Sequence, residues 1–158
     1  MNYYYITGTS RGIGKAIAEE LLGRENNFVY GISRNNTIEH QNYQHIALDI
    51  SDLERVKEFT FGDHPDAGKI VLINNAGILG HVTPVGNLYT EKIINSYNIN
   101  LISPSILTNR FITQYKEHGG ERMIVNTSSG AARHTIPSWS TYCATKAGLE
   151  MLARVIED

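Results

Sequence analysis

Residues 3–23 read YYYITGTSRGIGKAIAEELLG, and this stretch decides the fold. The aromatic and β-branched run Tyr3–Thr7 predicts a strand, and three glycines follow it within seven residues. The next segment, Lys15–Gly23, carries apolar residues at helical spacing and predicts a helix. A strand that enters a helix through a glycine-rich turn is the opening unit of a doubly wound α/β sheet.

The rest of the chain continues the alternation of strand and helix. Lys69–Asn74 is nearly continuously apolar, as expected of a central strand that is covered on both faces. Right-handed crossovers then predict an α/β fold with a doubly wound parallel sheet of the Rossmann type, in one domain over residues 1–158. The other expected strands are Phe28–Ile32, His45–Leu48 and Arg122–Thr127. The expected helices are one capped by Ser51 or Asp52, a long one over Thr90–Glu117 that Pro104 interrupts, and Ser138–Ile156.

Composition and charge exclude several classes of protein. Of the 158 residues, 41% are hydrophobic and 19% are charged, as in a globular domain rather than a disordered or membrane-spanning chain. A net charge of −2 gives no broad positive field for nucleic acid or an anionic membrane surface. The single cysteine, Cys143, excludes an internal disulfide, and the histidines lack paired ligand spacing, so we expect no metal site. Without a signal peptide or a long apolar run, we expect a cytoplasmic protein.

The glycine-rich turn is a candidate phosphate-binding loop. Its backbone N–H groups and the dipole of the following helix can hold a pyrophosphate. Glycine is needed because a Cβ would block the close approach of the phosphates and the packing of helix against strand. The alternative is an ordinary turn without a ligand. On the first interpretation, the cofactor contacts are Gly8, Ser10, Arg11, Gly12, Ile13 and Gly14.

The end of the second strand indicates which dinucleotide is bound. A fold that prefers NAD usually has an acidic residue there, which binds the ribose hydroxyls. This chain has Ser33 and Arg34 instead. A guanidinium can bind a 2′-phosphate through two charge-assisted hydrogen bonds, and Arg11 can reach the same phosphate. We therefore predict NADP(H), with two solvated surface arginines as the alternative.

A tyrosine and a lysine lie four residues apart, on one face of the last expected helix. In YCATK, residues 142–146, the ammonium of Lys146 can stabilise the phenolate of Tyr142, which can then act as general acid and base. The alternative is chance spacing on an exposed helix face. Other polar residues fall at or near strand ends, the edge where an open parallel sheet binds ligands. They are Asn74-Asn75-Ala76-Gly77, Asn100 and Ser128-Ser129.

Together these motifs resemble the short-chain dehydrogenase/reductase family. The resemblance rests on TGTSRGIG, NNAG, the second asparagine of NINLISP, the second serine of NTSSG, and YCATK, in the family's order and spacing. It implies that Tyr142 protonates a substrate carbonyl oxygen while hydride arrives from the nicotinamide, and that Ser129 hydrogen-bonds the same oxygen. It further implies that Lys146 holds the nicotinamide ribose and that Asn100 completes a proton relay through a water.

The resemblance extends to the adenosine end and to the substrate. It places Asp49 near the adenine amino group, although Asp49 can instead be a helix cap, and it places Asn75, Ala76 and Gly77 along the adenosine ribose. Residues 129–152, SGAARHTIPSWSTYCATKAGLEML, look most like bacterial benzil reductase and sepiapterin-reductase-like carbonyl reductases. This implies NADPH-dependent reduction of a small-molecule ketone or diketone to an alcohol.

Pro104 bears on the same site. Inside a helix it has no N–H to donate to the carbonyl of residue 100, which is that of Asn100. The oxygen can then accept a hydrogen bond from a water between Asn100 and Lys146. The alternative is a simple kink in a long helix.

The resemblance also concerns the extent of the chain. Family members continue beyond the helix that carries Tyr142 and Lys146, and they form homodimers or homotetramers, so we expect an assembly and a missing C-terminal part. Such a chain is a truncated product, a piece of a longer protein or a natural short form, and it has an uncovered parallel sheet edge. The alternative function is a non-catalytic NADP(H)-binding or interaction protein, or an inactive fragment.

Overall fold

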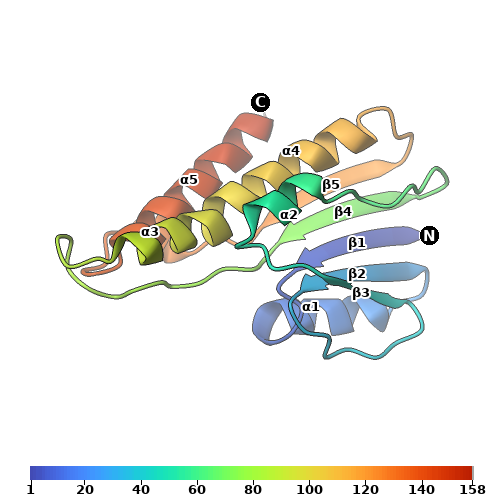
Figure 1. The fold of residues 1–158 in the computed structure, drawn as a ribbon. Helices are drawn as coiled ribbons and strands as arrows, with labels where there is room; N and C mark the ends of the chain where they lie inside the picture. Colours follow the sequence, from blue (N-terminus) through green and yellow to red (C-terminus); the bar gives the residue numbers. More distant parts are fainter. Residues whose placement is uncertain (158) are drawn as a thin grey trace.

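The computed structural model describes residues 1–157, so Asp158, the last residue of the expected domain, lies outside the described residues. Within them, five strands form one parallel sheet in the order β3-β2-β1-β4-β5 (Figure 1). The chain moves outward from β1 to β3 and then crosses back to β4 and β5, which confirms the doubly wound α/β fold. The strands are β1 (Asn2–Thr7), β2 (Asn27–Ser33), β3 (Tyr43–Ala47), β4 (Lys69–Asn74) and β5 (Glu121–Asn126).

Helices cover both faces of the sheet (Figure 1). One face carries α1 (Gly12–Leu22), and the other carries α2 (Leu53–Glu58), α4 (Ser103–Tyr115) and α5 (Ser140–Glu157). The short helix α3 (Thr90–Tyr97) lies beyond the carboxyl ends of the strands. No helix in residues 1–157 is both long enough and apolar enough to cross a membrane.

Alternate residues of the central strands supply two cores. On β1, Tyr5 belongs to the core on the α4 side, together with Leu107, whereas its neighbour Ile6 packs with Ala18 and Leu22 of α1. Strand β4 supplies both cores in the same way. This alternation is the period of two that strands impose on their side chains. It confirms β4 as a strand covered on both faces and holds the carboxyl ends of the strands in fixed positions.

The helix expected over Thr90–Glu117 is divided into three segments. A π-helical turn, Asn98–Ile102, separates α3 from α4. The N–H of Ser103 donates to the carbonyl oxygen of Asn98, five residues earlier. Because Pro104 has no N–H for the usual bond to the carbonyl four residues back, the hydrogen-bond ladder is offset here. The predicted interruption is confirmed, and it takes the form of a π turn.

The structure corrects the start of the last helix and decides the cap of α2. The last helix begins at Ser140, not at Ser138, because Ser138 has a φ of 67°, which a right-handed helix does not allow. Helix α2 is capped by Asp52, whose carboxylate accepts the N–H of Arg55 at 3.2 Å. This decides between the two expected caps and shows that Asp49 is not the cap.

Candidate active site

A cleft of about 500 Å³ opens at the carboxyl ends of the strands. It lies between the glycine loop, the residues that follow β2 and β3, and the segment after β4. The expected cofactor contacts that line it are Gly8, Ser10, Arg11, Gly12, Ile13, Ser33, Arg34, Asp49, Asn75, Ala76 and Gly77. The lining residues that sequence patterns did not assign to a cofactor are Ile32, Leu48, Ile50, Ser51, Ile78, Asn95 and Ile99. Most of these are apolar, and nothing in the sequence separates them from core residues.

The glycines of the loop meet two different requirements. A Cβ on Gly8, whose φ is 80°, would lie 3.0 Å from the Cα of Ala76. A Cβ on Gly14 would collide with the carbonyl oxygen of Gly8 and the side-chain amide of Asn75, so Gly14 packs α1 against the loop rather than lining the cleft. Gly12 has a φ of 61° and open space beside it. The loop therefore presents bare backbone to the cleft, which fits a pyrophosphate.

Thr7 joins the ends of β1 and β4 beneath the cleft. Its hydroxyl oxygen accepts the N–H groups of Asn75 and Ala76, each at 3.0 Å. The side-chain amide of Asn75 donates in return to the carbonyl oxygen of Thr7 at 3.0 Å. Thr7 is 1% exposed. Sequence patterns placed Thr7 only at the end of a strand, because a buried hydroxyl that binds another strand has no local sequence signal.

Two arginines stand at the rim of the cleft. Arg11 is exposed, and the side chain of Arg34 is 72% exposed and lies 4.0 Å from a carboxylate oxygen of Asp49. The other oxygen of Asp49 accepts the N–H and the hydroxyl of Ser51, at 2.9 and 2.8 Å. Burial raises the pKa of Asp49, but these hydrogen bonds and the charge of Arg34 outweigh burial and lower it. Asp49 is a fixed anion, and the guanidinium of Arg34 is only loosely held.

Ser33 lines the cleft, but its hydroxyl is directed into the protein. The residue is 7% exposed, and its hydroxyl donates to the carbonyl oxygen of Asn35 at 2.9 Å. The same oxygen lies 3.2 Å from the imidazole of His45 and 3.4 Å from the hydroxyl of Thr9. Ser33 therefore shapes the wall of the cleft, and its hydrogen-bonding capacity is used inside the fold.

Helix α5 brings Tyr142 and Lys146 together. The ammonium of Lys146 lies 5.8 Å from the centroid of the Tyr142 ring and donates to the carbonyl oxygen of Thr127 at 2.7 Å. Lys146 is 4% exposed, and burial lowers the pKa of its amine. The tyrosine and lysine predicted to act together are thus neighbours in space, and the lysine is held by the segment that follows β5.

Ser129 lies in that same segment. Its hydroxyl oxygen accepts the N–H of Ala131 at 3.2 Å and so caps a short 3₁₀ turn, Gly130–Ala132, which the sequence did not predict. The segment is fastened to α5 through Glu150. That carboxylate binds the guanidinium of Arg133 at 2.7 Å, and the hydroxyl of Ser128 donates to it at 3.4 Å. The residues on both sides of Ser129 are therefore bound to the helix that carries Tyr142.

Asn100 is 1% exposed, and its side chain is fully hydrogen-bonded. The amide oxygen accepts the N–H of Ile78 at 2.8 Å, and the amide nitrogen donates to the carbonyl oxygen of Ile78 at 2.8 Å and to the hydroxyl of Thr145 at 3.2 Å. A Cβ on Gly77 would lie 3.3 Å from the Asn100 amide oxygen and 3.7 Å from the Lys146 nitrogen. Asn100 therefore stands beside both the cleft and Lys146. Sequence patterns missed Thr145, which lies inside the YCATK motif.

Tyr142 has an aromatic neighbour, and a second aromatic pair lies in the loop before α3. The ring of Trp139 packs edge-on against Tyr142, with centroids 5.7 Å apart at 85°. In the loop before α3, His81 stacks on Tyr89 with centroids 5.3 Å apart. Among residues 1–157 no three His, Cys, Asp or Glu side chains are grouped closely enough to hold a metal ion. The ring of Trp139 gives Tyr142 an apolar neighbour, which suits an apolar or aromatic ligand.

Comparison with known proteins gives one consistent result. A family model described as short chain dehydrogenase matches residues 2–158. Benzil reductase, (S)-benzoin forming, of Bacillus subtilis strain 168 is 32% identical over 98% of this chain, and that of Bacillus cereus is 36% identical over 99%. A short-chain dehydrogenase/reductase from Burkholderia vietnamiensis, solved by crystallography, superposes with a TM-score of 0.85 at 28% identity over 98% of this chain.

The matches extend beyond this chain in length. The chain covers 65% of the Bacillus subtilis relative, 68% of the Bacillus cereus relative and 76% of the crystallised protein. It therefore spans about two thirds of the length of the curated relatives that it matches.

Proposed function

Since the chain belongs to the short-chain dehydrogenase/reductase family, we propose that it binds NADP(H) in the cleft and that Tyr142 is the proton donor in the reduction of a ketone or diketone to an alcohol. The observation that carries this proposal is spatial. Tyr142 and Lys146 are neighbours on α5, and Lys146 and Asn100 lie next to Gly77, which itself lines the cleft.

The residues around the cleft suit a dinucleotide. The glycine loop and the N-terminus of α1 would hold the pyrophosphate. Asp49 would accept a hydrogen bond from the adenine amino group, residues 75–77 would border the adenosine ribose, and Lys146 would bind the nicotinamide ribose. When bound there, NADPH supplies the hydride.

Side chains of this chain would carry out the proton transfer. Tyr142 would donate its phenolic proton to the substrate carbonyl oxygen, and the Ser129 hydroxyl would hydrogen-bond the same oxygen. Because the Ser129 oxygen accepts the N–H of Ala131, its hydrogen is available to donate. The ammonium of Lys146 would stabilise the phenolate that remains.

The proton relay would use the backbone of Asn100 rather than its side chain. Both side-chain hydrogens and the amide oxygen are occupied by Ile78 and Thr145. The carbonyl oxygen of Asn100 has no N–H partner at Pro104. We propose that a water bridges this oxygen and Lys146, which has two hydrogens left after binding Thr127.

The preference for NADP(H) rests on charge. No carboxylate follows β2, and the two guanidinium groups of Arg11 and Arg34 flank the adenosine end of the cleft. They would bind a 2′-phosphate, which an acidic residue would repel. The substrate class rests on the packing of Trp139 against Tyr142 and on the similarity to two benzil reductases, so we propose an aromatic ketone or diketone.

The alternative is a protein that binds NADP(H) without turnover, since dinucleotide-binding folds also serve functions other than catalysis. Substitution Tyr142→Phe separates the two. The chain and the variant are titrated with NADPH and NADH by fluorescence, and NADPH absorbance is followed after addition of benzil. Enzyme function predicts NADPH binding by both and turnover by the unsubstituted chain alone. Binding without turnover in both supports the alternative, and absence of NADPH binding contradicts both candidates.

A further inference from the structure

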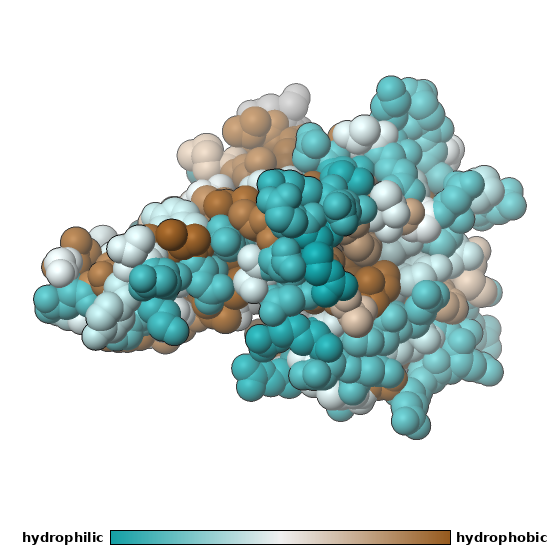
Figure 2. Space-filling view, viewed as in Figure 1, coloured by the Kyte–Doolittle hydropathy of each residue, from teal (hydrophilic) through white to brown (hydrophobic). Residues whose placement is uncertain are grey.

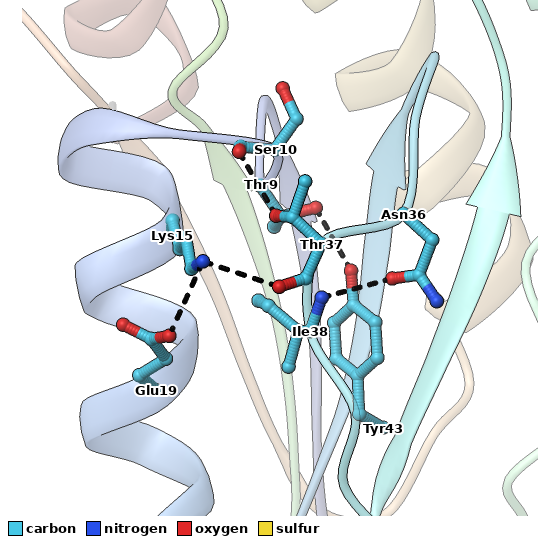
Figure 3. Close-up of polar contacts among 8 residues, drawn as sticks. All are labelled: Thr9, Ser10, Lys15, Glu19, Asn36, Thr37, Ile38 and Tyr43. Carbon is cyan, nitrogen blue, oxygen red and sulfur yellow. Dashed lines mark hydrogen bonds and ion pairs between the residues drawn. The ribbon is translucent and has the colours of Figure 1, made fainter.

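The connection between β2 and β3 runs beside the glycine loop (Figure 3). It begins at Arg34, and its middle is anchored by Ile38, which is 6% exposed and packs in the core with Ala18 of α1. The side-chain oxygen of Asn36 accepts the N–H of Ile38 at 3.2 Å, which closes a turn around Thr37. A buried side chain and a local turn thus hold Thr37 in place.

Thr37 is hydrogen-bonded on two sides (Figure 3). Its hydroxyl donates to the carbonyl oxygen of Ser10, in the glycine loop, at 2.9 Å. Its carbonyl oxygen accepts from the ammonium of Lys15, in the first turn of α1, at 3.2 Å. Lys15 also lies 3.7 Å from the carboxylate of Glu19, which holds the ammonium along the helix. Thr37 therefore joins the connection to the loop and to α1.

These bonds connect the segments that carry two arginines of the cleft. Arg11 directly follows Ser10, and Arg34 lies three residues before Thr37. The side chain of Arg34 is 72% exposed, and its ion pair with Asp49, at 4.0 Å, is loose. Together with the pairing of β2 in the sheet, the Ser10–Thr37 bond connects the backbone that follows Arg34 to the backbone next to Arg11. Two groups that must converge on one phosphate bind it more tightly when their backbones are already held.

We propose that Thr37 is a positioning residue for recognition of the 2′-phosphate, because its hydroxyl bonds the connection that begins at Arg34 to the glycine loop that carries Arg11. The inference rests on the proposed binding of NADP(H). Thr37 acts through the arginines and contributes to the affinity for NADPH. It contributes little to the affinity for NADH, which has no 2′-phosphate.

Substitution Thr37→Val removes the hydroxyl and keeps the shape of the side chain, and Thr37→Ser is the matched control that keeps the hydroxyl. Dissociation constants of NADPH and NADH are measured by fluorescence on the full chain and both variants. We expect Thr37→Val to weaken NADPH binding about fivefold, the effect of one hydrogen bond, and to change NADH binding less than about twofold. Thr37→Ser should retain the preference of the unsubstituted chain.

A double-mutant cycle with Arg34→Ala distinguishes positioning from a general structural effect. If Thr37 acts through Arg34, Thr37→Val should have little further effect on NADPH binding in the Arg34→Ala background. Binding of 2′,5′-ADP and 5′-ADP gives the same comparison without the nicotinamide. Thermal unfolding confirms that each variant is folded.

Four outcomes overturn the inference. Equal weakening of NADPH and NADH by Thr37→Val would show a structural role only. An unchanged preference in Thr37→Val, or full additivity with Arg34→Ala, would show that Thr37 does not act through the arginine. In each of these cases the unsubstituted chain still prefers NADPH and the proposed function stands. If the unsubstituted chain binds NADPH no better than NADH, the proposed cofactor preference is itself wrong, and the inference is overturned with it.

Discussion

Arg34 and Arg11 differ from the other residues of the cleft because their side chains are exposed and not held by strong partners. Most of the other polar groups around the cleft bind one another. A surface arginine contributes little to folding, so its position beside the adenosine end suits recognition of a ligand.

We predict that Arg34→Ala weakens NADPH binding on the order of tenfold or more and leaves NADH binding nearly unchanged, because a charge-assisted hydrogen bond to the 2′-phosphate is lost. The measurement is a fluorescence titration with each dinucleotide. Arg24→Ala is the matched control, since Arg24 is exposed and ion-paired with Glu20 far from the cleft. Equal loss of both affinities in Arg34→Ala would contradict the role in cofactor choice.

Gly14 acts through packing rather than through the ligand. A Cβ there would collide with the backbone of Gly8, which cannot move without disturbing the loop. We predict that Gly14→Ala lowers the free energy of unfolding by about 1–3 kcal/mol, measured by urea denaturation. It should also weaken the binding of both NADPH and NADH. Gly119→Ala is the control, because a Cβ on Gly119 meets nothing within 4 Å. A stable Gly14→Ala variant with normal binding would show that α1 can shift without cost.

At the scale of elements, the candidate site depends on how α5 is joined to the segment after β5. Glu150 of α5 binds Arg133 and Ser128, which lie on either side of Ser129, and also Arg154. Hydrogen bonds from the two arginines lower the pKa of Glu150 to about 2. The carboxylate is therefore ionised wherever the protein is expected to work.

We predict that Glu150→Gln reduces the free energy of unfolding by the same amount at all pH values above the ordinary glutamate pKa of 4.5. When folding lowers the pKa of a carboxyl group, its charge stabilises the folded state at pH values above the pKa in the unfolded chain. This stabilisation is lost as the pH falls toward the folded-state pKa of about 2. The difference in free energy of unfolding between the unsubstituted chain and Glu150→Gln, measured by urea denaturation, should therefore shrink below pH 4.5. Glu54→Gln, at the exposed pair with Lys57, should show little difference at any pH. A pH-independent difference for Glu150→Gln would contradict the assignment to its charge.

The π turn before α4 is a second link between elements. It places Asn100 so that its side chain holds Ile78, in the segment that leaves β4, and Thr145 of α5. Three segments that are distant in sequence therefore meet at one amide. In a regular α-helix the side chain of Asn100 would point in a different direction, since a π turn contains one more residue than an α-helical turn.

On the scale of the whole molecule, large apolar side chains remain exposed on several elements, Met151 and Val155 of α5 among them, and two of these regions bear on assembly. One is the loop before α3 and α3 itself, where Figure 2 shows hydrophobic atoms along the projecting arm of the molecule; the large exposed residues there are Leu79, Val82, Val85, Tyr89 and Ile94. The other is β5, an edge strand of the sheet, on which Met123 and Val125 are 42% and 39% exposed. Exposed apolar edges favour association. The expected homodimer or homotetramer stays a prediction.

We predict that residues 1–158 on their own self-associate through the β5 edge. Replacing Met123 and Val125 together by lysine should shift the chain toward monomer in sedimentation velocity, because lysine disfavours pairing of strand edges. Val85→Lys is the matched control, since Val85 is 78% exposed but lies outside the sheet. An unchanged sedimentation profile for the double variant, or an equal shift for Val85→Lys, would place the association elsewhere.

The order of the elements and the motifs that carry chemistry could be predicted from the sequence alone. Strand and helix periodicities are local properties, and β4 was predicted with its observed bounds because its run of apolar residues is continuous. The glycine loop and Arg34, which line the cleft, and the neighbouring Tyr142 and Lys146 were likewise selected as candidates, since a turn, a charge at a strand end and a spacing of four residues can be recognised within a few positions. Their functional roles stay predictions.

The hydrogen bonds that hold the site together were decided only by the tertiary structure. Thr7, Thr145 and Glu150 carry no local signal, because their partners come from other strands and helices. The same holds for Thr37, whose hydroxyl meets Ser10 across 27 residues of sequence. Sequence patterns specify which face each side chain takes and which chemistry it offers. Whether a hydroxyl, amide or carboxylate has a partner depends on distances between segments, which are set when the sheet and its helices pack together.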